Sequence, residues 1–208
     1  MNKLGRLQNE VKKMMHNEPA HDFEHILRVC NNAKKIARHE QVDEKMVVTA
    51  ALLHDVIHYP KTDTRSSKAS VQSAKLAKKI LKKYGYQEDE IRVIVDAIRD
   101  HSFSRGKTPK TMVGKILQDA DRLDALGAIG IARTFSVSGA ENRPFYNKND
   151  PFCKKRSPDD TSWSLDHFFR KLLLLEGMMN TKFARKEAKK RTIVLKRFLS
   201  ELKSEIQP

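Results

Sequence analysis

"AALLHDVIHYP", residues 50–60, is an apolar, helix-like run that ends in the polar dipeptide His-Asp. His54 lies four residues after Ala50 and seven after Val47, so it falls on the buried stripe of the predicted helix. Asp55 lies about a quarter-turn away from that stripe. Because a buried carboxylate without a partner is costly, we expect Asp55 to face a cation or several hydrogen-bond donors.

Helical periodicity extends over most of the chain. In residues 21–40, apolar side chains recur at three- and four-residue spacing, and Asp43 is placed to cap the helix that leads into the His-Asp pair. No alternating pattern of convincing length predicts a strand. The sequence therefore predicts an all-α, single-domain helical bundle over 1–208, with further helices at 66–84, 87–100, 111–135, 163–179 and 181–205.

One long segment, residues 136–162, is predicted to be irregular. It contains one glycine, three prolines and several Asn, Asp and Ser residues, too many for a regular element. A loop of this length in a compact domain is usually functional or disordered. It does not mark a domain boundary, because the apolar run that follows it needs a core to pack on.

Composition and cysteine usage narrow the class of protein. With 208 residues and 39% hydrophobic content, the chain can form one globular domain with a sizeable core. No run of about eighteen apolar residues predicts a membrane span, and the first residues do not read as a secretory signal. Cys30 and Cys153 lack metal-type spacing, as expected for reduced thiols in a cytoplasmic protein.

The formal net charge of +15 is concentrated in the predicted helix 181–205. Three interpretations compete: a nucleic-acid surface, attraction of phosphorylated substrates, or a solvated helix face. Lysine-rich exterior helices are ordinary, so the solvated face is favoured and charge by itself does not name a function.

Polar residues recur on the apolar faces of other predicted helices. His25 shares a face with Val29, and Asp121 lies four residues after Leu117 at the edge of a buried stripe. A lone histidine on an apolar face is more often a satisfied core residue, but recurrence on three helices favours a shared site. Two imidazoles and two carboxylates form a plausible site for one divalent ion, and manganese, iron, nickel, magnesium and zinc all remain open.

Several stretches resemble the motifs of the HD-domain metal-dependent phosphohydrolases, and within them the bacterial branch of small single-domain nucleotide phosphohydrolases. The most specific is "ILQDADRLDALGAIGIART" at 116–134. The others are "HDFEHILRV" at 21–29, "AALLHD" at 50–55, "DHSFSRG" at 100–106 and "HFFRKLLLLEGMMNT" at 167–181. The resemblance thus covers most of the chain.

The resemblance implies a ligand set for one divalent ion, with manganese favoured: His25, His54, Asp55 and Asp121. His21 and Asp22 match the same motif without being expected as ligands, and Asp22 is suited to cap its helix. Asp124 is expected to orient a ligand or to hold Arg28.

The resemblance also implies hydrolysis of a nucleoside triphosphate to a monophosphate and pyrophosphate. Proton transfer is expected from Asp55 or His101, although His101 could equally be a helix-end histidine in solvent. The candidate phosphate-binding residues are Lys61, Arg65, Arg28 and Lys171. The aromatic residues that could stack on a base are Phe103, Phe145, Tyr146, Phe152 and Trp163.

The irregular segment 136–162 is then a candidate lid over the substrate, with Arg143, Lys148 and the run 154–156 as its cations. Other bonds could be cut, by a phosphomonoesterase, a triphosphohydrolase, or a two-metal phosphodiesterase that uses His101 or His58 as extra ligands. A different class is a nucleic-acid-binding helical module without catalysis, supported by the basic last helix. The sequence leaves the oligomeric state open, a homodimer included.

Overall fold

The computed structural model describes residues 2–15, 22–59 and 63–206. His21 and Lys61, two residues to which the sequence assigns roles, lie outside the described residues. Within them all regular structure is helical and no strand occurs, which confirms the all-α prediction. The chain divides into two compact units, Met1–Asp121 and Arg122–Pro208. A single domain over the whole length stays a prediction.

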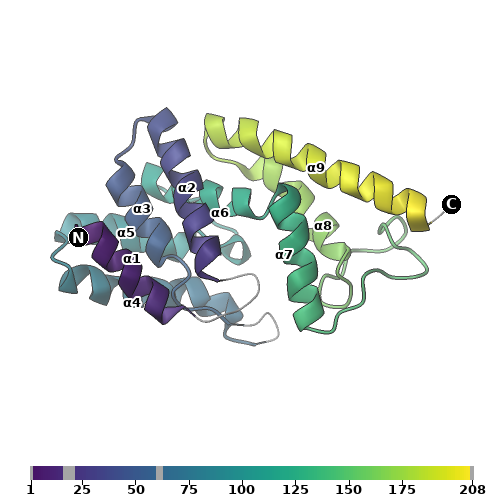
Figure 1. The fold of residues 1–208 in the computed structure, drawn as a ribbon, viewed down its shortest axis with the longest axis horizontal. Helices are drawn as coiled ribbons and strands as arrows, with labels where there is room; N and C mark the ends of the chain where they lie inside the picture. The colour runs from purple at the N-terminus through teal and green to yellow at the C-terminus, as the bar shows by residue number, and fades with distance from the viewer. Residues whose placement is uncertain (1, 16–21, 60–62, 207–208) are drawn as a thin grey trace. The chain divides into compact units, whose positions relative to one another are not determined.

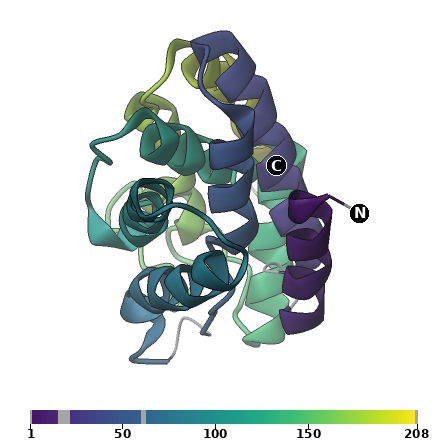
Figure 2. The ribbon, with the colours of Figure 1, turned by 90° about the vertical axis from the view of Figure 1, so that its left-hand side faces the viewer.

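The first unit contains helices whose order follows the chain, as Figure 1 shows by label and colour. They are α1 (Lys3–Met14), α2 (Phe23–Glu40), α3 (Glu44–Leu53), η1 (Ser66–Lys68), α4 (Ala69–Lys83), α5 (Glu88–Asp100), η2 (Phe103–Arg105) and the greater part of α6 (Met112–Asp124). Helix α3 packs on α1, α2 and α5, and α4 packs on α5. Figure 2 shows α4 and α5 toward the viewer.

Helix α3 is the central element of this unit because it has almost no polar face. Every residue from Val47 to Leu53 is buried. The hydroxyl of Thr49, the polar member of that run, forms a hydrogen bond of 3.1 Å with the hydroxyl of Tyr86. Each fully buried leucine or valine contributes roughly 1.5–3 kcal/mol to stability, so α3 is firmly fixed in the core. The His-Asp pair directly follows it.

Local sequence sets where the helices of the first unit begin. The Asp22 side chain accepts a hydrogen bond of 2.9 Å from the backbone N–H of His25, and Asp43 accepts one of 2.8 Å from that of Lys45. At the start of α5, Glu90 accepts a bond of 2.9 Å from the backbone N–H of Gln87. Such caps satisfy backbone donors that have no partner within the helix.

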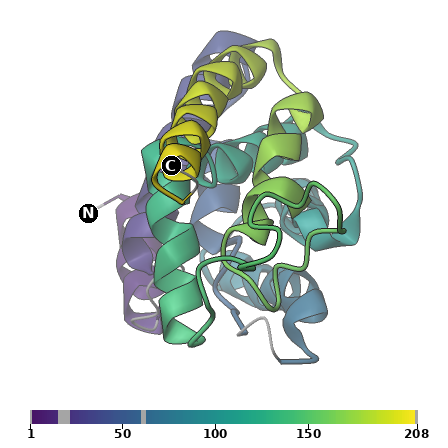
Figure 3. The same ribbon diagram turned by 90° about the vertical axis from the view of Figure 1, so that its right-hand side faces the viewer.

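The second unit contains α7 (Gly127–Ala140), α8 (Asp166–Arg170), η3 (Leu172–Met178) and α9 (Lys182–Ile206). Helix α7 packs along α9, as the green and yellow helices of Figure 3 show. Phenylalanine rings join these elements: the ring centre of Phe168 lies 5.6 Å from that of Phe198 and 6.2 Å from that of Phe135. The core of this unit is therefore aromatic.

Two predicted helices are wrong in their extent. The predicted helix 111–135 is two helices, because Gly127 adopts a φ of +72° that ends one helical path and begins another. The predicted helix 163–179 is the short α8 followed by the 3₁₀ helix η3, with a break at Lys171, where φ is −136°. The irregular segment accordingly begins at 141, because α7 continues to Ala140, and helix α1 was not predicted.

The irregular segment, residues 141–165, is held by its own hydrogen bonds (Figure 3). The carboxylate of Asp166 is fully buried and accepts two bonds from Arg156, of 2.5 and 2.7 Å, and one of 2.6 Å from the backbone N–H of Asp159. Arg143 pairs with Glu141. The two arginines predicted as lid cations thus have carboxylate partners within their own unit.

None of the described helices combines the length and the apolar character needed to cross a bilayer.

Two glycines of α7 predict opposite effects of the same substitution. A methyl group at Gly130 would clash with the carbonyl oxygen of Ala125, whereas one at Gly139 would meet nothing within 4 Å. We expect Gly130→Ala to lower the free energy of unfolding by about 1–3 kcal/mol through overpacking. Gly139→Ala should raise it by about 0.5–1 kcal/mol, since alanine restricts the unfolded chain. Urea unfolding measures both; a neutral Gly130→Ala would contradict the close approach.

Candidate metal centre

Five ionisable side chains of the first unit meet at one place. His25 comes from α2, His54 is the residue that ends α3, Asp55 follows it, His101 ends α5, and Asp121 lies on α6. The structure thus brings together the four residues that the sequence proposes as ligands, and it adds the histidine proposed for proton transfer.

The nitrogen and oxygen atoms of this cluster lie at closely similar separations. Nε2 of His25 is 3.9 Å from Oδ2 of Asp55 and 3.7 Å from Oδ1 of Asp121. Nε2 of His54 lies 3.9 Å from each of the same two oxygens. Oδ1 of Asp55 is 4.0 Å from Nε2 of His101. The carboxylate of Asp55 therefore has one oxygen toward His25 and His54 and the other toward His101.

The backbone around each residue fixes its position. Asp22 caps the backbone N–H of His25 itself, so the start of α2 is tied to the site. After the His-Asp pair, Ser73 of α4 both accepts a bond of 3.1 Å from the N–H of Ile57 and donates one of 3.2 Å to its carbonyl. On α6, the carbonyl of Ala120 accepts a bond of 3.2 Å from the Asn32 amide of α2. Every element that carries a ligand is thus anchored by a side chain.

The tautomers of His54 and His101 follow from their hydrogen bonds. Nδ1 of His54 lies 2.8 Å from the carbonyl of Ala51, and Nδ1 of His101 lies 2.6 Å from that of Ile98. A carbonyl oxygen only accepts, so each Nδ1 carries the proton. In the neutral ring Nε2 then has its lone pair available, as a metal-ligating histidine requires.

Burial differs between the nitrogen and oxygen donors. The side chains of His25 and His54 are fully buried, whereas those of Asp55 and Asp121 are 18% and 27% exposed. Among the described residues, no hydrogen-bond partner is found for Nε2 of His54. The imidazoles of His25 and His54 thus lie on the buried side of the site, and the carboxylates of Asp55 and Asp121 lie on the side that solvent or a ligand can reach.

These donors fit a divalent ion. Ligand distances of about 2.0–2.2 Å place neighbouring donor atoms roughly 3–4 Å apart, which matches the separations above. Within the described part of the chain, two groups have metal-binding geometry: His25, His54 and Asp121, and His54, Asp55 and His101. Mixed imidazole and carboxylate ligands without thiolate suit several first-row divalent metals.

The electrostatics of the cluster favour an ionised Asp121 and a neutral His101. Burial alone raises the pKa of Asp121, but attraction to His54, His25 and His101 in their protonated forms outweighs it, and the pKa of Asp121 lies below its ordinary value. Burial, reinforced by repulsion from His54, lowers the pKa of His101. His101 is 4% exposed, so the alternative of a helix-end histidine in solvent is wrong.

The remaining residues that the sequence proposed are not members of this cluster. Arg28 follows His25 by one turn on α2 and is partly exposed. The guanidinium of Arg65 is held by Asp63 at 2.7 Å and lies over the ring of Tyr59. Lys171 and Asp124 belong to the second unit, where Asp124 is 2% exposed and accepts a bond of 2.7 Å from Arg133.

Sequence reasoning missed the side chains that support the cluster. Ser73 lies among Ala74, Ala77 and Ile80 on the buried stripe of α4, and Gln118 lies on the buried stripe of α6, three residues before Asp121. The sequence signal for both residues was a polar side chain on an apolar helix face. A serine or glutamine in such a position, however, more often bonds a nearby backbone group than takes part in a functional site.

The two cysteines offer no nucleophile. Burial raises the pKa of the Cys30 thiol to about 12, and burial together with Asp166 raises that of Cys153 to about 11. A reactive cysteine needs the opposite shift, because the thiolate is the reactive form.

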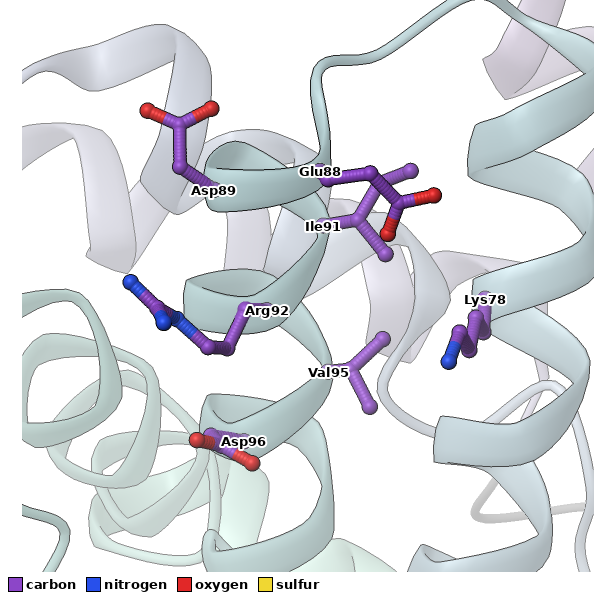
Figure 4. A pocket seen from close by; sticks show the side chains of 7 residues that line it. All are labelled: Lys78, Glu88, Asp89, Ile91, Arg92, Val95 and Asp96. Atoms are coloured by element: carbon purple, nitrogen blue, oxygen red, sulfur yellow. The ribbon is translucent and has the colours of Figure 1, made fainter.

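A separate pocket of ≈ 450 Å³ opens between α4 and α5. Figure 4 shows Ile91 and Val95 of α5 on the side that faces Lys78 of α4, while Asp89 and Arg92 lie on the other side of α5. None of the residues that line it belongs to the histidine and aspartate cluster. It is a surface hollow between two helices rather than part of the site.

The chain is similar in sequence to known proteins. The model of the HD domain family matches residues 22–126, which include every member of the cluster. The chain is 37% identical over 191 residues to the YpgQ protein of Bacillus subtilis strain 168, covering 89% of this chain and 84% of that protein.

Solved structures show the same fold. The crystal structure of B. subtilis YpgQ in complex with ADP superposes with a TM-score of 0.77 at 32% identity, over 98% of each chain. An HD-superfamily hydrolase from Bacillus thuringiensis gives 0.74 at 32% identity, over 98% of this chain and 96% of that one. A predicted HD-superfamily hydrolase from an uncultured Thermotogales bacterium gives 0.65 at 30%, over 97% and 92%.

The cluster predicts stabilisation by a divalent ion. At a free concentration of about 100 times its Kd, Mn²⁺ should add about 2.7 kcal/mol to the free energy of unfolding and raise the Tm by several degrees. Asp121→Asn keeps the size of the side chain but removes an anionic ligand, so most of this rise should be lost. Asp96→Asn, at an exposed carboxylate of α5, is the matched control and should respond as the unaltered protein does. Equal shifts in all three proteins would contradict the site.

Proposed function

Since the chain belongs to the HD domain family, we propose that it is a divalent-metal-dependent phosphohydrolase acting on nucleotides, which converts a nucleoside triphosphate to a monophosphate and pyrophosphate. The observation that carries this proposal is the convergence of His25, His54, Asp55 and Asp121, whose donor atoms lie 3.7–3.9 Å apart across the pairs given above.

In this proposal one ion, with manganese the favoured metal, is held by the two neutral imidazoles and the two carboxylates. A divalent cation at such a site supplies Lewis acidity toward a phosphoryl oxygen and toward water. The residues themselves fix the direction of approach, because the imidazoles close the buried side and Asp55 and Asp121 border the exposed side. A phosphate therefore enters past the carboxylates.

Proton transfer falls to Asp55 and His101 in the proposed reaction. Oδ1 of Asp55 lies 4.0 Å from Nε2 of His101. With Nδ1 held by the carbonyl of Ile98, only Nε2 of His101 can exchange a proton with a substrate or water. His101 is thereby suited to protonate a leaving oxygen or to take a proton from the attacking water.

A nucleotide substrate is supported by the ADP bound to the homologous B. subtilis protein and by the net charge of +15, which attracts phosphorylated molecules. Arg28, next to His25 on α2, is the proposed phosphate contact from the first unit, with Arg65 and Lys61 as further candidates. Lys171 as a phosphate contact and the segment 136–162 as a lid are further proposals that come from the sequence.

Other reactions of the same site remain as alternatives: release of a single phosphate, removal of triphosphate, or two-metal phosphodiester hydrolysis. The last is favoured by the second group of metal-binding geometry, His54, Asp55 and His101, although both groups share His54. A nucleic-acid-binding role rests on the exposed cations of α9: Lys182, Arg185, Lys186, Lys189, Lys190, Lys196, Arg197 and Lys203. That role predicts salt-sensitive binding that survives loss of the ligands.

A cytoplasmic location and a homodimer also belong to the proposal. The thiols of Cys30 and Cys153 form no disulfide, as is usual for proteins of a reducing compartment.

The test is a reaction panel. The protein is stripped with chelator, reloaded with Mn²⁺, Fe²⁺, Ni²⁺, Mg²⁺ or Zn²⁺, and incubated with ribo- and deoxyribonucleotides, and the products are separated by chromatography. We expect pyrophosphate and a monophosphate with at least one ion. Orthophosphate or tripolyphosphate would instead identify one of the alternative reactions, and no product under any condition would contradict the proposal.

A paired substitution separates catalysis from folding. His54→Ala should lower turnover by at least about 10³-fold, since the site loses a buried ligand, while the far-ultraviolet circular dichroism keeps its helical signal. His39→Ala, at an exposed histidine in the last turn of α2, should leave turnover unchanged. Equal activity of the two variants would show that the cluster is not the reaction site.

A further inference from the structure

The end of α5 has an unusual supply of side-chain donors. The last carbonyl groups of a helix have no partner within it and normally turn to water or to a capping residue. At the end of α5 four consecutive carbonyls, from Ile98 to His101, each accept a hydrogen bond from a side chain. His101 itself supplies the bond to Ile98, and Ser70 of α4 supplies one of 3.1 Å to Arg99.

Gln118 of α6 supplies the remaining bonds. Its Nε2 lies 3.1 Å from the carbonyl of His101, 2.8 Å from that of Lys107 and 3.4 Å from that of Asp100. All three partners can only accept, which fixes the nitrogen rather than the oxygen of the amide on this side. Two amide hydrogens serve the two short bonds, and the long one to Asp100 is weak.

The position of Gln118 makes these bonds relevant to the site. It is 1% exposed and lies three residues before Asp121 on the same helix, so the residue that holds the His101 backbone shares a rigid element with a proposed metal ligand. The bond to Lys107 in addition closes the turn that follows His101. The bond from Gln118 to the carbonyl of His101 therefore fixes the position of the His101 backbone, and with it the imidazole, relative to α6.

We propose that Gln118 is a positioning residue for the reaction: it holds the end of α5 so that Nε2 of His101 faces Asp55. Because Nε2 of Gln118 reaches the carbonyl of His101, Gln118 acts on the reaction through His101. This inference rests on the proposed function for its kinetic consequence, but the placement of the ring can be measured without any metal or substrate.

The first experiment observes the ring. Long-range ¹H–¹⁵N spectra of the metal-free protein distinguish histidine rings protonated at Nδ1 from those protonated at Nε2. In the unaltered protein we expect His54 and His101 both to show the Nδ1–H form. Gln118→Met keeps the side-chain length but donates nothing, so the His101 signal should shift toward a mixture of tautomers while that of His54 is unchanged. An unchanged His101 signal would overturn the proposal, whatever the enzyme activity.

Two further variants support this measurement. Thr49→Val removes a buried hydrogen bond of α3 and should leave the His101 signal unchanged, so a shift there would assign the effect to general loosening and overturn the inference. Ser70→Ala removes the neighbouring bond to Arg99 and should give a smaller shift of the same His101 signal. If Gln118→Met does not fold, Ser70→Ala is the deciding variant. A shift of its His101 signal would support the role of side-chain donors in holding the end of α5, and an unchanged signal would contradict it.

The second experiment is a double-mutant cycle in turnover. In the unaltered background Gln118→Met should lower kcat by about 10- to 100-fold with less than about a threefold change in KM, as misplacement of a catalytic group does. In the His101→Ala background the same change should cost less than about twofold, because the group it positions is gone. Equal losses in both backgrounds would overturn the inference. An inactive unaltered protein would instead contradict the proposed function and leave the ring measurement to decide this one.

Discussion

The burial of three imidazoles beside two partly exposed carboxylates is the constraint on which the first unit depends. Isolated buried charges cost several kcal/mol each, so such a group is stable only when protonation, pairing and hydrogen bonds are settled together. Here Nδ1 of His54 and Nδ1 of His101 each bond a backbone carbonyl, and the carboxylates stay partly in contact with solvent. The packing of α2, α3, α5 and α6 has to bring these groups to one point, and the apolar burial of α3 supplies the rigidity to do so.

Helix ends provide the local chemistry of this arrangement. His54 ends α3 and His101 ends α5, and each donates its Nδ1–H to the carbonyl three residues before it. That bond satisfies a carbonyl without an intrahelical partner and at the same time directs Nε2 away from the helix. Because both helices end in this way, the imidazoles of His54 and His101 both face the carboxylate of Asp55.

The second unit has a different basis of stability. Its order comes from stacked phenylalanine rings and from the buried Asp166, which collects bonds from Arg156 and the backbone of Asp159. These bonds give a definite structure to a segment rich in proline and asparagine. Among the described residues, the groups with metal-binding geometry all belong to the first unit. The charge of α9 is displayed at the surface, where it adds little stability but attracts anions.

The sequence by itself determined the helical class, the caps at Asp22 and Asp43, and the four proposed ligands, because periodicity and capping are local and a polar residue on an apolar stripe is visible in one dimension. It placed α9 within a residue at each end. Only the tertiary structure decided that α7 begins at the positive φ of Gly127 and that His101 is buried beside Asp55. Only it revealed the bonds of Gln118 to three carbonyls. Such features depend on which residues distant in the chain meet in space. The sequence around the end of α5 does not show which side chain will bond its carbonyl groups.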